Sequence, residues 1–132
     1  MGLARVAARS ECCAAGMMPK KIAILGAECT GKSALAVALA ATMNGIVVPE
    51  ILRAWCDARK RTPRQSEQRT IFDLQLQSEC DIYAAAQQHN NNFVFCDTTP
   101  LSVAVHSIHY FNDDALLAAA LTHQRSYAIT LL

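Results

Sequence analysis

The amino-acid sequence predicts an α/β fold in three layers, with helices on both faces of a mostly parallel sheet. Short apolar runs typical of buried strands alternate with stretches that favour helix, and this alternation indicates βαβ units. The first apolar run passes directly into a turn with two glycines and then into a helix-favouring stretch. The length of 132 residues suits one domain, and 52% hydrophobic residues are enough for a buried core.

The first half of the chain predicts two strands, each followed by a helix. Residues 22–25 form a continuous apolar run that ends at a glycine, which is typical of a strand buried on both faces. Residues 33–43 are rich in Ala and Leu and are followed by Asn-Gly, a helix stop signal. A second buried strand is predicted over residues 46–48, where a proline ends it, and a short helix over residues 51–60.

The second half continues the alternation. After a polar loop over residues 61–66, residues 67–88 carry apolar side chains at helical spacing and end in three asparagines. A third strand follows over residues 93–96, and Thr99-Pro100 supplies a helix cap and a first helical residue. The apolar positions of the long helix are Ile71, Leu74, Ile82, Ala85 and Ala86, and the last predicted elements are helices over 101–110 and 113–123 and a strand over 127–132.

The chain has no feature of a membrane, secreted or nucleic-acid-binding protein. Its longest apolar run has eight residues, too few to cross a bilayer, and residues 1–19 lack a signal-peptide core. A formal charge of +1 gives no basic surface for nucleic acid. Six cysteines without a C-x-x-C pair exclude a zinc ribbon and are typical of reduced cytoplasmic thiols. We expect a leader over residues 1–19 and a cytoplasmic domain over residues 20–132, with neither membrane nor nucleic acid as partner.

The turn after the first strand matches the pattern G-x-x-x-x-G-K-[ST] and predicts a phosphate-binding P-loop. Its glycines allow consecutive N–H groups to curl around a phosphate at a helix N-terminus. The lysine reaches the β- and γ-phosphates, and the serine hydroxyl binds Mg²⁺. We therefore expect ATP and Mg²⁺ at the residues Gly26, Ala27, Glu28, Cys29, Thr30, Gly31, Lys32 and Ser33.

Asp97 follows the third strand and is the candidate second ligand of Mg²⁺. Ligands of open α/β sheets bind at the carboxyl ends of the strands, where a P-loop and this carboxylate would meet. The alternative is an aspartate that only caps the turn toward Thr99 and Pro100. Together with the P-loop, Asp97 predicts a P-loop NTPase sandwich.

Beyond the loop, the sequence resembles the ribosylnicotinamide kinase domain of NadR proteins and the related AAA-labelled P-loop ATPases. The residues that carry the resemblance occur in the order of that family and extend from about Lys20 to Leu132. They are the loop Gly26–Ser33, then Val48-Pro49-Glu50 with Arg53, then Gln75 with Glu79, and then Cys96-Asp97-Thr98. The resemblance implies ATP-dependent phosphoryl transfer to a nucleoside-like acceptor.

The sequence departs from this family in two places. Cys29 stands where the loop usually has serine, and we expect a thiol at a helix N-terminus to be sensitive to oxidation. Family members also continue past the fourth strand with a lid and a fifth strand. The expected domain therefore has four strands, lacks the fifth, and resembles a C-terminally truncated kinase.

The resemblance assigns a catalytic role to Glu50 and a nucleotide-binding role to Arg53. In P-loop nucleoside kinases a carboxylate at the end of the second strand accepts the proton of the attacking hydroxyl. The alternative is that Glu50 is only an acidic residue at the start of the next helix, where the helix dipole stabilises its negative charge. Arg53 begins a basic stretch with a local excess of four positive charges, whose other members we expect on a solvated surface. Lys32, Glu50 and Asp97 are thus the predicted catalytic residues.

The remaining polar and aromatic residues leave their roles open. Gln75 and Glu79 could touch a ribose or base, or form an ordinary exposed pair four residues apart. His106 and His109 lack the partners of a metal site and favour packing or surface roles. The large aromatic residues that we expect in the core are Trp55, Phe72, Tyr83 and Phe111.

Three functional hypotheses follow. The favoured one is an ATP-dependent kinase acting on a nucleoside-like acceptor. The second is a regulatory or interaction protein that binds ATP or GTP without acceptor chemistry, because the phosphate loop does not distinguish the purines. The third is an inactive fragment with an unfinished sheet, whose exposed edge would favour association.

Overall fold

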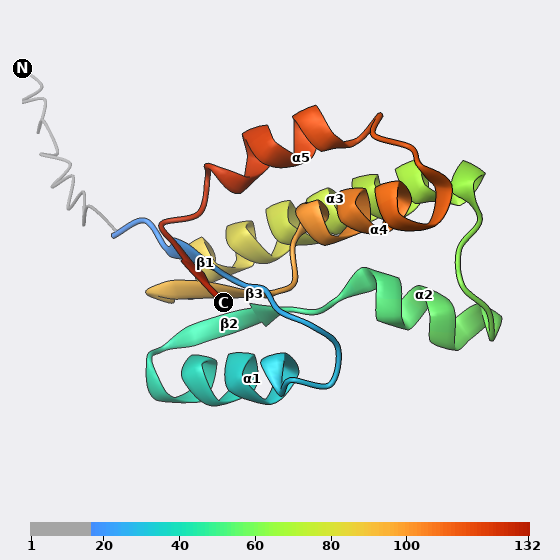
Figure 1. Cartoon of the computed structure of the whole chain (residues 1–132). Helices are drawn as coiled ribbons and strands as arrows, with labels where there is room; N and C mark the ends of the chain where they lie inside the picture. Colours follow the sequence, from blue (N-terminus) through green and yellow to red (C-terminus); the bar gives the residue numbers. More distant parts are fainter. Residues whose placement is uncertain (1–16) are drawn as a thin grey trace, which may run out of the picture.

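The computed structural model describes residues 17–132 and places a four-stranded parallel sheet between two layers of helices (Figure 1). The strand order is β2-β3-β1-β4. The predicted α/β fold is confirmed, and every strand pairing in the sheet is parallel. In chain order the elements are β1 (Lys20–Ile24), α1 (Lys32–Thr42), β2 (Gly45–Val48), α2 (Ile51–Arg59), the short 3₁₀ helix η1 (Gln65–Glu67), α3 (Gln68–Gln88), β3 (Phe93–Asp97), α4 (Pro100–Phe111), α5 (Leu117–Gln124) and β4 (Ile129–Leu131).

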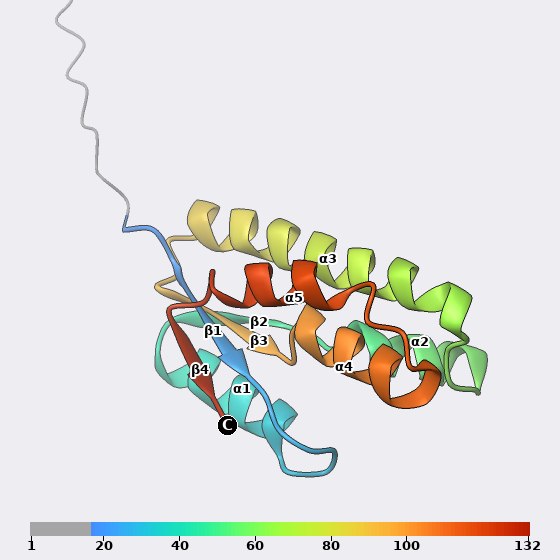
Figure 2. The same cartoon turned by 45° about the horizontal axis from the view of Figure 1, so that its top comes forward.

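The two faces of the sheet carry separate apolar cores. Helix α1 covers one face, where Ala36 packs with Ile22 and Phe95. Helices α3 and α5 lie over the other face (Figure 2), where Ala86 packs with Ala23 and other strand residues. Successive strand residues point to opposite faces, so each buried strand needs apolar residues at every position. This requirement explains the continuous apolar runs of the sequence.

A third core lies among the helices, beyond the carboxyl ends of β2 and β3 (Figure 1). Trp55 of α2 packs there with Phe72 of α3 and Val103 of α4. This core fixes α2 and α4 beside the edge of the sheet at which the strands end. The candidate site lies at the same edge.

Several predicted element boundaries are shifted, and β1 begins at Lys20 instead of residue 22. Helix α5 begins at Leu117 instead of residue 113, because Asp113 Oδ1 accepts a hydrogen bond from Ala115 N and forms a turn that is not helical. The last strand covers only Ile129–Leu131 instead of residues 127–132. Tyr127 is instead buried in the core beneath α3.

The predicted buried face of α3 is also partly wrong. Leu74 is 47% exposed, whereas the polar residues Gln75 and Glu79 are 2% and 1% exposed. The alternative of an exposed pair at these two positions is therefore incorrect. Phe72 is buried as expected, but Phe111 is only partly buried.

The leader predicted for residues 1–19 lies mostly outside the described residues, which begin at Met17. Of the three leader residues that are described, Pro19 is buried, and Met18 Sδ accepts a hydrogen bond from Gln87 Nε2 at 3.2 Å. From residue 17 onward, no helix combines the length and hydropathy required to cross a bilayer.

Candidate phosphate-binding site

The loop between β1 and α1 has the backbone conformation that a phosphate-binding loop requires. Gly26 has φ +152° and Gly31 has φ +84°, and Cys29 adopts a left-handed φ of +58° without being glycine. A Cβ atom on Gly31 would meet nothing within 4 Å, so its backbone angle and not a lack of space makes glycine favourable there. Gly31 is the N-cap residue of α1 and has no side chain that could bond the first N–H groups of the helix. The first N–H groups of α1 thus remain free for an anion.

Lys32 turns back across this loop. Its side chain is 8% exposed, and its Nζ donates a hydrogen bond to Ala27 O at 2.5 Å. An ammonium group has three donors, and Ala27 O is the one acceptor found for it among residues 17–132. A buried cation with spare donors inside a loop of free N–H groups is suited to an anionic ligand.

The register of the sheet brings Asp97 to the phosphate loop. Ile24, two residues before Gly26, pairs with Asp97 across β1 and β3. Ser33 at the start of α1 donates from Oγ to Asp97 Oδ2 at 2.5 Å. Two residues 64 positions apart in the sequence thus share one hydrogen bond at the carboxyl edge of the sheet.

Ser33 and Asp97 fit a magnesium site. Asp97 is 5% exposed, and its other oxygen, Oδ1, is buried with no hydrogen-bond partner in the described structure. Mg²⁺ prefers oxygen ligands and is usually held by one or two protein groups together with phosphates and water. The described residues contain no group of three His, Cys, Asp or Glu side chains that could hold a metal ion, so these two oxygens would share the ion with a nucleotide.

Glu50 and Arg53, at the start of α2, complete the site. Arg53 donates from Nη1 to Ser33 Oγ at 3.1 Å and forms an ion pair from Nη2 to Glu50 Oε2 at 3.2 Å. Glu50 lies between β2 and α2, and Arg53 lies in the first turn of α2. Strand β2 is parallel to β3, so both strands end at the same edge of the sheet. The structure thus brings Lys32, Ser33, Glu50, Arg53 and Asp97 together.

The pKa of Glu50 is raised from its ordinary value of 4.5. Burial is the main cause, Asp97 and Glu28 add to it, and Arg53 and Lys32 oppose it. A carboxyl group with a raised pKa is a better proton acceptor than an ordinary glutamate. The arrangement can therefore neutralise phosphate charge and accept a proton within one small region.

Gln75 and Glu79 do not line this site. Gln75 Oε1 accepts a hydrogen bond from Ile51 N at 3.0 Å, and its Nε2 lies 3.5 Å from Pro49 O. Glu79 accepts a hydrogen bond from the Tyr127 hydroxyl and pairs with His123 Nε2 at 2.7 Å. Gln75 acts on the site indirectly, because it fixes the backbone on both sides of Glu50.

Most residues of the basic stretch form ion pairs on the surface or pack against Trp55 of the helical core. Arg61 forms a two-pronged pair with Glu67, and Arg69 pairs with Asp73 at 3.0 Å. The guanidinium groups of Arg59 and Arg61 also lie over the ring of Trp55. Arg53 is the member of this stretch that reaches the phosphate loop.

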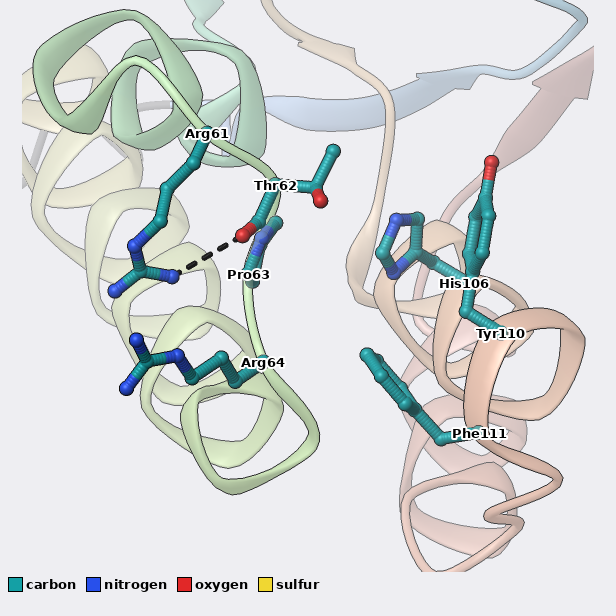
Figure 3. A pocket seen from close by; sticks show the side chains of 7 residues that line it. All are labelled: Arg61, Thr62, Pro63, Arg64, His106, Tyr110 and Phe111. Carbon is teal, nitrogen blue, oxygen red and sulfur yellow. Dashed lines mark hydrogen bonds between the residues drawn. The ribbon is translucent and has the colours of Figure 1, made fainter.

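Sequence reasoning missed one feature near the site. His106, Tyr110 and Phe111 of α4 face the loop after α2 across a cavity (Figure 3). The signal in the sequence was a cluster of rings near the end of one predicted helix, which also fits ordinary packing. Only the fold shows that a loop from a distant part of the sequence lies opposite these rings.

Comparison with known proteins identifies the family. A family model described as an AAA domain matches residues 21–132, which includes every residue of the site. No curated protein matches the chain. The match covers most of the sequence, and the four-stranded parallel sheet with its glycine-rich loop agrees with a nucleotide-binding P-loop fold. The chain therefore belongs to the family of AAA domains.

Proposed function

We propose that this protein transfers the γ-phosphoryl group of ATP to a hydroxyl group of a small nucleoside-like acceptor. The observation that carries the proposal is the position of Glu50, whose carboxylate pairs with Arg53 while Arg53 contacts the Ser33–Asp97 pair. A proton acceptor thus lies beside the residues that would hold the terminal phosphate and the metal. The resemblance to the ribosylnicotinamide kinase domain of NadR proteins supports the class of acceptor.

In the proposed reaction, the acceptor oxygen attacks the γ-phosphorus, and the bond from this phosphorus to the β–γ bridging oxygen breaks. ADP leaves with the electron pair of that bond, and the hydroxyl proton passes to Glu50. Lys32 and the free N–H groups of the loop bind the β- and γ-phosphates, and Arg53 supplies a further positive charge. Mg²⁺, held through Ser33 and Asp97, would neutralise charge on the transferred group.

The proposal includes a cytoplasmic location, where thiols stay reduced and ATP is abundant.

The change Glu50→Gln tests the proton acceptor. Rates with ribosylnicotinamide and Mg-ATP should fall about 10²- to 10⁴-fold, the usual contribution of general base catalysis. Only the ionised carboxylate accepts a proton, so the wild-type rate should rise with pH as Glu50 ionises. The midpoint of that rise should lie above 4.5 because the pKa of Glu50 is raised. The Glu50→Gln variant should lack this rise and still bind Mg-ATP.

ADP release measured with and without the acceptor separates the hypotheses. Acceptor-dependent ADP formation supports the kinase. Nucleotide binding without it, across a panel of nucleosides, would indicate a regulatory protein that binds ATP or GTP. A rate and pH profile unaffected by Glu50→Gln would remove Glu50 from the mechanism.

A further inference from the structure

A cavity of about 410 Å³ lies between the loop that follows α2 and the C-terminal half of α4 (Figure 3). This volume is within the range of small-molecule sites in proteins. The loop contributes Arg61, Thr62, Pro63 and Arg64, and the helix contributes His106, Tyr110 and Phe111. We call this space the ring-lined cavity.

Flat surfaces line most of the ring-lined cavity. The imidazole of His106 points toward Thr62 and Pro63, and the ring of Phe111 extends toward the same loop (Figure 3). The His106 and Tyr110 rings lie 4.5 Å apart between centroids, and those of His106 and Phe111 lie 6.4 Å apart. Rings at these distances and a proline opposite them provide apolar faces against which a planar group can pack.

Two charged residues, Arg61 and Arg64, line the loop side of this cavity. The guanidinium groups of Arg61 and Arg64 point to the far side of the loop in Figure 3, and that of Arg61 is held there by Glu67 at 2.7 and 2.8 Å. Burial, with a smaller effect of His109, lowers the pKa of His106 and favours its neutral form, although Glu28 acts in the opposite direction. The guanidinium groups thus point away from the rings, and the neutral form of His106 adds no positive charge beside them.

His106 gives the cavity one unsatisfied polar atom. Its Nδ1 is buried and has no hydrogen-bond partner within residues 17–132. Buried polar atoms are nearly always hydrogen-bonded in folded proteins. A turn of the His106 ring toward the cavity would let a polar atom on a flat ligand ring supply the missing partner.

The position of α4 connects this cavity with the phosphate site. Helix α4 starts at Pro100, just after Asp97, and His106 lies about 9 Å further along the helix axis. The Glu28 carboxylate of the phosphate loop is close enough to act electrostatically on His106. A molecule seated on these rings could therefore extend toward the phosphate loop.

We infer that the ring-lined cavity binds the heteroaromatic ring of the acceptor, a planar ring without negative charge, through contacts with Tyr110, Phe111 and Pro63 and a hydrogen bond with His106. This assignment rests on the proposed function in one respect, which is that the bound molecule is called the acceptor. The binding itself needs no phosphoryl transfer and is tested without it.

Saturation-transfer NMR on the full chain tests the assignment with three nucleosides. Ribosylnicotinamide and uridine carry rings without negative charge, and orotidine carries a carboxylate on its ring. Ring protons of the first two should receive magnetisation from the protein, and those of orotidine should receive little. Titrations should give dissociation constants about tenfold higher for Tyr110→Ala and for His106→Phe, as expected for a lost ring contact or hydrogen bond.

The control variant is Val105→Ala, on the same helix but outside the cavity, where the side chain is 54% exposed. Tyr110 is itself 64% exposed, so Tyr110→Ala should keep the fold, as thermal unfolding will show. Ring binding that is absent in the wild type, or equally strong in Tyr110→Ala and His106→Phe, would overturn the inference. Ring binding that responds to these variants without any ADP formation would support the cavity and refute the proposed kinase.

Discussion

Ser33 Oγ has two partners, and one of them competes with a metal ion. It donates to Asp97 and accepts from Arg53 at 3.1 Å. Arg53 has to leave this oxygen when a cation binds there, because two positive groups at that distance repel each other. Its side chain is 53% exposed and therefore has room to turn toward a phosphate. Arg53 thus fits the role of a mobile phosphate ligand.

The change Arg53→Ala should raise the KM for Mg-ATP about tenfold, the loss expected for one charge-assisted hydrogen bond. Steady-state kinetics measures it, and fluorescence of Trp55, the single tryptophan of the chain, gives the affinity independently. Arg69→Ala is the matched control, because Arg69 pairs with Asp73 on the exposed face of α3. Equal KM values for Arg53→Ala and the wild type would exclude contact of Arg53 with the nucleotide.

The start of α2 depends on a side chain of α3. Gln75 Oε1 accepts from Ile51 N, and Gln75 Nε2 approaches Pro49 O, so α3 holds the backbone on either side of Glu50. Gln75 is 2% exposed, and burial strengthens the requirement for these hydrogen bonds. Helix α3 therefore positions the proposed proton acceptor without reaching the site itself.

Replacing Gln75 by leucine should lower the free energy of unfolding by about 1–3 kcal/mol, because Ile51 N would be left without a partner. Urea unfolding followed by circular dichroism measures this loss. Gln77→Leu serves as the control, since Gln77 bonds only the exposed Asp81 among the described residues. If Gln75→Leu proves as stable as Gln77→Leu, α2 is held by its packing alone.

Local sequence pattern was sufficient to predict that each α-helix and strand exists, and insufficient to predict the buried face of α3. It also missed the short 3₁₀ helix η1, which lies where a loop was expected. The strands were predictable because both faces of the sheet are covered and the central strand positions are apolar in succession. The buried residues Gln75 and Glu79 have partners 24 to 48 positions away. Such long-range hydrogen bonds leave no periodic signal, so hydropathy favoured Leu74 instead.

A buried polar network joins four parts of the molecule. Glu79 of α3 accepts from the Tyr127 hydroxyl before β4, pairs with His123 of α5, and lies 3.8 Å from Lys21 Nζ of β1. Burial and the Glu79 carboxylate raise the pKa of Tyr127, so its hydroxyl stays protonated and remains a donor. The network ties the C-terminal strand to the rest of the fold.

Tyr127→Phe should destabilise the protein by about 1.5–3 kcal/mol, the usual contribution of a hydrogen bond to a charged group. Differential scanning calorimetry measures the change. Tyr83→Phe is the comparison, because Tyr83 packs against the same core and has no hydrogen bond from its hydroxyl within the described residues. Similar stabilities of the two variants would indicate that Glu79 is satisfied by His123 and Lys21 without Tyr127.

At the scale of the whole molecule, the sequence predicts the residues of the phosphate site better than their surroundings. The glycine-rich loop is contiguous, and Asp97 ends a strand, so both could be placed at one sheet edge before the structure was known. The contact of Arg53 with Ser33 and the ring-lined cavity depend on how α2 and α4 pack beyond the sheet. Helix packing of this kind is a tertiary property that no local motif encodes.

The central claim is that the protein binds a nucleotide at a site that includes Lys32. Its most direct test is thermal unfolding with Mg-ATP, with Mg-GTP and without nucleotide. A ligand that binds only the folded state must stabilise it, and at about 100 times Kd the unfolding temperature should rise by roughly 8 °C. The account predicts this rise for the wild type with at least one nucleotide and no rise for Lys32→Ala. A cooperative wild-type transition that neither nucleotide shifts, or an equal shift in the Lys32→Ala variant, would contradict it.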